Sequence, residues 1–67
     1  MYKLWFYSEH KNRWVHIENL EESEIGEVTD VVAKFPRRWC VIDPSGNPIY
    51  WRKGDAAPEV ENGEPMS

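Results

Sequence analysis

Apolar and polar residues alternate along two neighbouring segments near the start of the chain, residues 2–8 and 13–18. A period of two is typical of β-strands, and the polar residues 9–12 predict a hairpin turn between them. This loop length sets the cross-strand pairs as Phe6 with Val15, Leu4 with Ile17, Tyr7 with Trp14, Trp5 with His16, and Lys3 with Glu18. The first two pairs share the predicted core face, and the aromatic residues of the next two share the opposite face.

The spacing of apolar residues becomes helical between residues 23 and 35. One stripe contains apolar residues three or four positions apart, namely Ile25, Val28, Val31, Val32 and Phe35. Ser23 is expected to cap the start of the helix, where acidic side chains suit the positive end of the helix dipole. Pro36 is expected to end the helix, because its ring keeps the preceding residue out of the helical region.

A second hairpin is predicted by residues 38–42 and 48–52 and by the turn sequence Asp43-Pro44-Ser45-Gly46-Asn47. Proline at the second turn position and glycine where φ is positive are strong turn signals, and they pair Asp43 with Asn47. The pairs that follow are Val41 with Ile49, Trp39 with Trp51, Cys40 with Tyr50, and Arg38 with Arg52. Because Pro48 lacks an N–H group, we expect the last strand to lie at an edge of the sheet or to start late.

These elements predict an α+β fold of the order ββαββ in residues 1–53, with a four-stranded, mainly antiparallel sheet and one helix on one face. The pattern leaves open whether the first strand lies beside the third or the fourth. It also leaves open which side of the second hairpin meets the helix, the one with Cys40, Ile42 and Tyr50 or the one with Trp39, Val41, Ile49 and Trp51. Residues 54–67 are polar and acidic with one isolated Val60, which predicts a disordered tail.

Charge is divided between these two parts. The 67-residue chain has a formal net charge of −4, and residues 54–67 account for it because residues 1–53 hold eight basic and eight acidic side chains. Cys40 is the only cysteine, which excludes an intrachain disulfide and fits a reducing compartment. His10, His16 and Cys40 match no zinc spacing, so neither a metal nor another cofactor is expected. Because no segment resembles a targeting signal or a membrane span, we expect a cytoplasmic protein.

The aromatic content indicates a binding surface. Four Trp, three Tyr and two Phe are more than one helix can cover on the two faces of a small sheet. The candidate interaction surface on the uncovered face consists of Trp5, Tyr7, Trp14, His16, Arg38, Tyr50 and Arg52. Trp, Tyr and Arg are enriched at binding hot spots, so we expect a small non-catalytic module that self-associates or binds a protein partner. The simpler alternative is that the rings pack on one another, or on the tail, for stability alone. By analogy, a short hairpin–helix–hairpin chain that ends in a polar tail is of a type common among small proteins of unassigned function, including those of phages and mobile elements.

Two further functions are alternatives. Arg38, Trp39, Trp51 and Arg52 interleave guanidinium groups with rings, a combination that binds single-stranded nucleic acid, although strand-end charges commonly serve solubility. Six acidic residues between positions 18 and 30 would also suit an acidic nucleic-acid mimic, although a helix start has the same pattern. Neither an enzyme nor a small-molecule substrate is expected, because no nucleophile–base pair or phosphate loop is evident and Cys40 is expected to pack within a strand.

Overall fold

The computed structural model describes residues 1–66. Its elements are β1 (Tyr2–Ser8), β2 (Arg13–Leu20), the short 3-10 helix η1 (Glu22–Glu24), α1 (Ile25–Val32), β3 (Trp39–Ile42), β4 (Pro48–Trp51), β5 (Val60–Glu61) and β6 (Glu64–Pro65). No helix in this part of the chain combines the length and apolar character that crossing a membrane requires.

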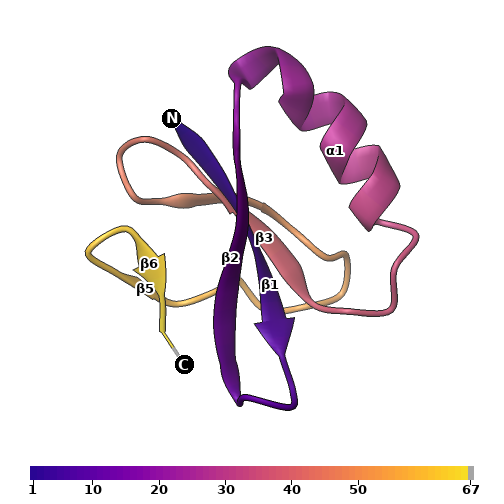
Figure 1. The fold of residues 1–67 in the computed structure, drawn as a ribbon, viewed down its shortest axis with the longest axis vertical. Coiled ribbons are helices and arrows are strands. Elements are labelled where there is room, and N and C mark those ends of the chain that lie inside the picture. Colours follow the sequence, from indigo (N-terminus) through magenta and orange to yellow (C-terminus); the bar gives the residue numbers. More distant parts are fainter. Residues whose placement is uncertain (67) are drawn as a thin grey trace.

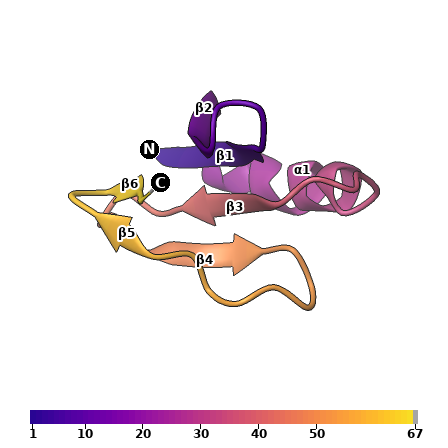
Figure 2. The same cartoon turned by 90° about the horizontal axis from the view of Figure 1, so that it is seen from below.

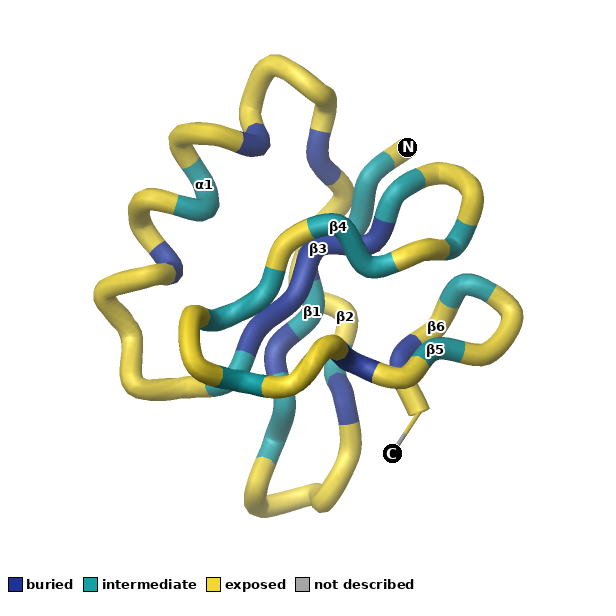
Figure 3. The backbone as a smooth tube through the Cα atoms, turned by 180° about the vertical axis from the view of Figure 1, so that it is seen from behind, coloured by how far each residue is buried: buried dark blue, intermediate teal, exposed yellow. Residues whose placement is uncertain are grey.

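The first four strands form one antiparallel sheet in the order β2-β1-β3-β4. Helix α1 lies on one side of this sheet and the β5–β6 hairpin on the other (Figures 1 and 2). The predicted α+β fold, a four-stranded antiparallel sheet with a single helix on one face, is therefore confirmed. The neighbour of β1 is β3, which leaves β2 and β4 as the edges, and β3 is buried along its whole length (Figure 3).

The first hairpin has the predicted register near its turn and departs from it further on. Trp5 pairs with His16, and the predicted pairs of Phe6 and Tyr7 also form. A bulge then shifts the ladder, so that Leu4 lies opposite Glu18. The prediction that Ile17 faces Leu4 in the core is wrong, because the bulge removes Ile17 from the ladder and leaves it 44% exposed.

The second hairpin forms the predicted turn but not the predicted register. The Asp43 N–H group donates to the Asn47 carbonyl at 2.9 Å, which closes the turn. A register shift next to Ile42, which pairs with Pro48, then places Cys40 opposite Trp51. Val41 lies opposite Tyr50 for the same reason. The predicted pairing was wrong by one residue, and each bulge sends the following side chains to the other face.

Helix α1 is shorter than the apolar stripe suggested. Ser23 does not cap it but lies inside η1, whose N-cap is Glu21, because the Glu21 N–H group donates to Glu24 Oε1 at 2.9 Å; α1 follows directly after Glu24. Beyond Val32 the chain tightens into a turn in which the Phe35 N–H group donates to the Val32 carbonyl at 3.0 Å. The first and last residues of the helix, Ile25 and Val32, are buried, and Val32 and Val28 pack in the helix-side cluster.

Two apolar clusters stabilise the sheet, one on each side. The helix-side core contains Leu4, Phe6, Leu20, Val32, Trp39 and Val41, with Tyr2, Val28 and Ile49 packed against it. The opposite cluster contains Trp14, Cys40 and Ile42, with Trp5, Tyr7, Trp51 and Val60 packed against it. This answers the question left open by the sequence, because Trp39, Val41 and Ile49 meet the helix, whereas Trp51 lies on the other side.

Residues 54–66 differ from the disordered tail that their composition predicts. They contain the two-stranded hairpin β5–β6, whose turn is formed by Asn62 and Gly63. Both turn residues have positive φ, at 55° and 79°, which is the geometry of a tight hairpin whose twist matches that of the strands. The Asn-Gly pair thus supplies a local turn that overall composition does not reveal.

Apolar contacts hold this segment against the sheet. Pro58 and Pro65 are buried, and Val60 packs against the cluster that contains Cys40 and Ile42. Prolines are already restricted in the unfolded chain, so ordering them requires less conformational entropy. The segment therefore covers one end of the sheet face opposite α1.

Candidate functional site

The sheet face opposite α1 carries most of the candidate residues and is called the aromatic face below. It is formed by Trp5, Tyr7, Trp14, His16, Cys40, Ile42 and Trp51. Two cross-strand ring pairs are the structural basis of this face. The Trp5 and His16 centroids lie 5.1 Å apart, and Tyr7 meets Trp14 edge-on at 5.5 Å. Such pairs stabilise adjacent strands and orient their rings, which pre-forms the surface.

Arg38 lies over the end of this face. Its guanidinium carbon is 5.3 Å from the Tyr7 ring centroid and 5.2 Å from that of Trp14. Its backbone position is fixed because the Arg38 carbonyl accepts a hydrogen bond from the Tyr7 N–H group at 3.0 Å. Stacking against two rings is attractive through the ring quadrupoles and restrains the long side chain.

A second arginine meets the first through a shared carboxylate. Arg52 donates from Nε and one terminal nitrogen to Asp55, at 3.0 and 2.9 Å, and from the other terminal nitrogen to the Pro36 carbonyl at 2.7 Å. Arg38 Nε lies 3.6 Å from the same Asp55 carboxylate, whose side chain is only 17% exposed. We call Arg38, Arg52 and Asp55 the arginine clamp. Its two-point contact with Asp55 has the geometry that guanidinium groups use to recognise carboxylates and phosphates.

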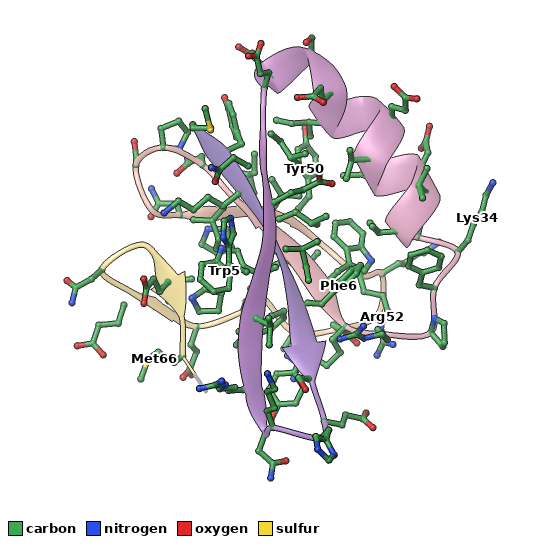
Figure 4. The ribbon with its side chains drawn as sticks, in the orientation of Figure 1. Trp5, Phe6, Lys34, Tyr50, Arg52 and Met66 are labelled. Atoms are coloured by element: carbon green, nitrogen blue, oxygen red, sulfur yellow. The ribbon has the colours of Figure 1, made fainter. Side chains whose placement is uncertain are left out.

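A cavity of about 320 Å³ lies beside the clamp, between the aromatic face and the C-terminal segment. Its walls are Tyr7, Trp14, Arg38, Ala56, Ala57, Pro58, Glu59 and Met66. Nearby, Trp5 extends from β1 toward the β5–β6 hairpin (Figure 4). Its Nε1 atom is buried without a hydrogen-bond partner in residues 1–66. Trp39 Nε1, in the helix-side core, is likewise buried without a partner in the described residues, so this feature does not distinguish the two faces.

Six of the seven candidate residues lie together on or next to this face. Trp14 is buried and only 8% exposed, whereas Trp5 and Tyr7 are partly buried and His16 is exposed. Arg38 and Arg52 are partly buried in the clamp. Tyr50 is the exception. It is 50% exposed but pairs with Val41, which places it on the helix side of the sheet. The one-residue shift of the second hairpin is the reason for this difference.

The four residues that the sequence suggested for nucleic-acid binding, Arg38, Trp39, Trp51 and Arg52, do not all lie on one face of the sheet. Trp39 is 5% exposed and belongs to the helix-side core, whereas Trp51 packs on the aromatic face. Arg38 and Arg52 are both paired with Asp55. The four residues do not form one open surface with parallel stacking platforms.

Cys40 is a packing residue of the central strand. It is fully buried, and this burial raises the pKa of its thiol to about 12, while the nearby Arg38 charge acts in the opposite direction. A thiol with this pKa is protonated at neutral pH, and only the thiolate is a strong nucleophile. In residues 1–66 no group of three His, Cys, Asp or Glu side chains is arranged to hold a metal ion.

Asp55, Pro58 and Val60 belong to the site but were assigned to the disordered tail by the sequence analysis. A signal for the first was present, because Asp55 follows Arg52 by three positions and can pair with it across a tight turn. The turn itself depends on Gly54, which has a φ of 92°. The remaining two residues became interpretable only through the hairpin that they flank.

No protein-family model, curated protein or solved structure matches the chain. The site is therefore interpreted from its own geometry and chemistry.

Proposed function

We propose that the protein is a non-catalytic protein-interaction module that uses the aromatic face and the arginine clamp to hold an extended, acidic segment of a partner protein. The observation that carries this proposal is that the chain's own C-terminal segment contacts this surface, with Asp55 in the clamp and Val60 against the aromatic face. The groups of the segment that contact the surface indicate which kinds of group the surface can bind. In this protein the Asp55 carboxylate contacts two guanidinium groups, and an apolar side chain packs against the aromatic face.

The partner chemistry follows from these contacts. A carboxylate in the place of Asp55 would keep the bidentate contact to Arg52, and an apolar side chain such as valine would pack on the aromatic face as Val60 does. Exposed His16 and partly exposed Trp5 extend the surface beyond the part that the C-terminal segment covers. Aromatic and arginine side chains are the usual anchors of protein interfaces, which supports a protein partner.

Single-stranded nucleic-acid binding has less support. Trp39 lies within the helix-side core and Trp51 on the aromatic face, so the two rings cannot stack on the same strand of nucleic acid. The acidic-mimic function rests only on the exposed acids near α1, which also suit the start of a helix. The aromatic face combines oriented rings, an anion-binding pair of arginines and a bound segment, so it is the better supported site.

A trans-binding experiment tests the proposal. A peptide with the sequence of residues 54–66 is titrated by calorimetry into a chain that ends at Lys53 and, in parallel, into the full chain. We expect measurable binding to the shortened chain and at least about tenfold weaker binding to the full chain, because the attached segment competes at high effective concentration. The near-ultraviolet circular dichroism of the shortened chain must match that of the full chain, which shows that the shortened chain is folded.

The full chain carrying Asp55→Asn provides a second arm that does not depend on the shortened chain folding. This change loosens the segment without removing it, so peptide binding should increase relative to the unchanged full chain. A scrambled peptide of the same composition is the control for charge alone. The proposal would be refuted if the shortened chain and the Asp55→Asn chain are both folded and neither binds the peptide at millimolar concentration. Tight binding of labelled oligonucleotides at roughly 50 mM salt would favour the nucleic-acid alternative instead.

A further inference from the structure

Helix α1 leaves an apolar stripe uncovered on the side away from the aromatic face. Val31 is 50% exposed and Phe35 is 45% exposed, although they are large apolar residues four positions apart. The Phe35 ring is fixed in place by an edge-on contact with Phe6, at 6.2 Å between centroids. Tyr50, also 50% exposed, lies on the same side of the sheet (Figure 4). Val31 and Phe35 form the exposed stripe.

Charges of opposite sign flank the two ends of this stripe. All six charged side chains between positions 18 and 30 are acidic and exposed, and four of them, Glu21, Glu22, Glu24 and Glu27, lie just before the helix or in its first turn, whereas Asp30 lies in its last turn. Beyond its end lie three exposed basic side chains, Lys34, Arg37 and Lys53. Both ion pairs found in residues 1–66 involve Asp55, so none of these charges is neutralised by another residue of the described chain.

We infer that the exposed stripe of α1 is a self-association surface on which a second copy of this chain docks with its helix antiparallel to the first. In such a two-fold arrangement each contact occurs twice, because residue i of one copy meets residue j of the other and the reverse. The two Val31 side chains then meet near the two-fold axis, and Glu27 of one copy lies near Lys34 of the other.

The charge pattern selects a second copy over a foreign partner. Acidic side chains at the start of α1 and basic side chains beyond its end are complementary to the same arrangement turned around, and the two helix dipoles then oppose each other favourably. Glu27 and Lys34 are separated by roughly 10 Å along the axis, so they contribute little to each other within one copy in physiological salt. Across the antiparallel contact, opposite charges instead come into close range.

Sedimentation equilibrium of the full chain, up to millimolar concentration and at low salt, tests this inference. We expect a monomer–dimer equilibrium that weakens when salt is raised, since screening reduces the charge contacts. Val31→Glu should raise the dissociation constant by more than about tenfold, because it places two unpaired charges in the apolar contact. Ile17→Glu is the matched control. Ile17 is similarly exposed at 44% but lies on edge strand β2, so this change should leave the dissociation constant unaltered.

Charge exchange separates a specific contact from general stickiness. Glu27→Lys alone and Lys34→Glu alone should each weaken the dimer about fivefold, since each substitution acts at two symmetric contacts. The two together in one chain should restore most of the affinity, because the complementarity of the ends is re-formed with reversed sign. Both side chains are exposed, so the variants are expected to fold. A chain that stays monomeric at millimolar concentration, or a double variant weaker than either single one, would overturn the inference. This outcome is independent of the peptide titration on the aromatic face.

Discussion

Gly46 and Gly63 touch where the turn of the second sheet hairpin meets the turn of the C-terminal hairpin. A Cβ atom on Gly46 would lie 3.0 Å from the Gly63 Cα atom, closer than side chains normally approach a backbone. Both residues have positive φ, at 89° and 79°, so each is required by its own turn as well. This contact joins the C-terminal segment to the sheet at the end opposite the arginine clamp.

Gly46→Ala should therefore destabilise the protein by about 2 kcal/mol, through backbone strain and displacement of the C-terminal hairpin. Gly54→Ala separates the two effects. Its φ is 92° but nothing lies within 4 Å of the added Cβ, so a loss of about 1 kcal/mol is expected. Gly26→Ala, in the helix with open space around it, should stabilise by about 0.5 kcal/mol. Urea unfolding measures all three, and an equal effect at all three positions would contradict the close contact.

Leu20→Ala and Ile17→Ala distinguish the observed register of β2 from the one that simple alternation predicts. Leu20 is 1% exposed in the helix-side core, so its truncation should destabilise by about 2–5 kcal/mol and leave little folded protein. Ile17 lies at the bulge, 44% exposed, and its truncation should change stability by less than about 1 kcal/mol. Chemical unfolding followed by circular dichroism gives both values. The reverse ranking would mean that β2 pairs without the bulge.

Asp55→Asn should destabilise the protein by about 1–2 kcal/mol, because it leaves two arginines without their common acceptor in a partly buried place. The difference from the unchanged chain should shrink at high salt, since the interaction is electrostatic. Glu61→Gln is the control. Glu61 is exposed and makes no ion pair in the described chain, so its effect should stay within about 0.5 kcal/mol. Equal effects of the two substitutions in urea unfolding would argue against the clamp.

Cys40 should be unreactive toward thiol reagents in the native protein at neutral pH and should react rapidly in denaturant. The pKa of its thiol rises from an ordinary 9.0 to about 12 in the fold, chiefly because of burial. The unfolded thiol therefore ionises first as the pH rises. Its contribution to stability is complete below pH 9 and is lost progressively between pH 9 and pH 12. In that range the loss is up to about 1.4 kcal/mol per pH unit. Cys40→Ala should remove this part of the alkaline slope of the unfolding free energy, and an unchanged slope would refute the assignment.

The sequence was sufficient for the elements whose signals are local. The pairs Tyr7–Trp14 and Trp5–His16 followed from the loop length, and the second turn followed from its proline and glycine. The bulges at Ile17 and Ile49 could not be predicted, because alternation of residue types assumes an uninterrupted ladder. Each bulge places the side chains beyond it on the face opposite to the predicted one. For this reason Tyr50 lies on the helix side, not on the aromatic face, and Trp51 lies on the aromatic face.

Only the part of the candidate site that depends on local strand pairing could be predicted from the sequence. The rings and Arg38 came from strands that pair locally, whereas Asp55 belongs to a segment whose composition predicts disorder. Its position depends on contacts between parts of the chain that composition does not connect. Only the Asn62-Gly63 turn signalled order there, and a short hairpin signal is weak when its flanking strands are polar.

The uneven distribution of the four indole rings gives the molecule an internal optical reporter. Trp5, Trp14 and Trp51 pack on the aromatic face under or beside the C-terminal segment, whereas Trp39 is enclosed on the helix side. Displacement of that segment would therefore change the emission of the three rings that it shelters and leave the fourth nearly constant. Loosening of the helix would do the opposite. Intrinsic fluorescence of variants that keep one ring at a time could follow occupancy of each side of the sheet without any added label.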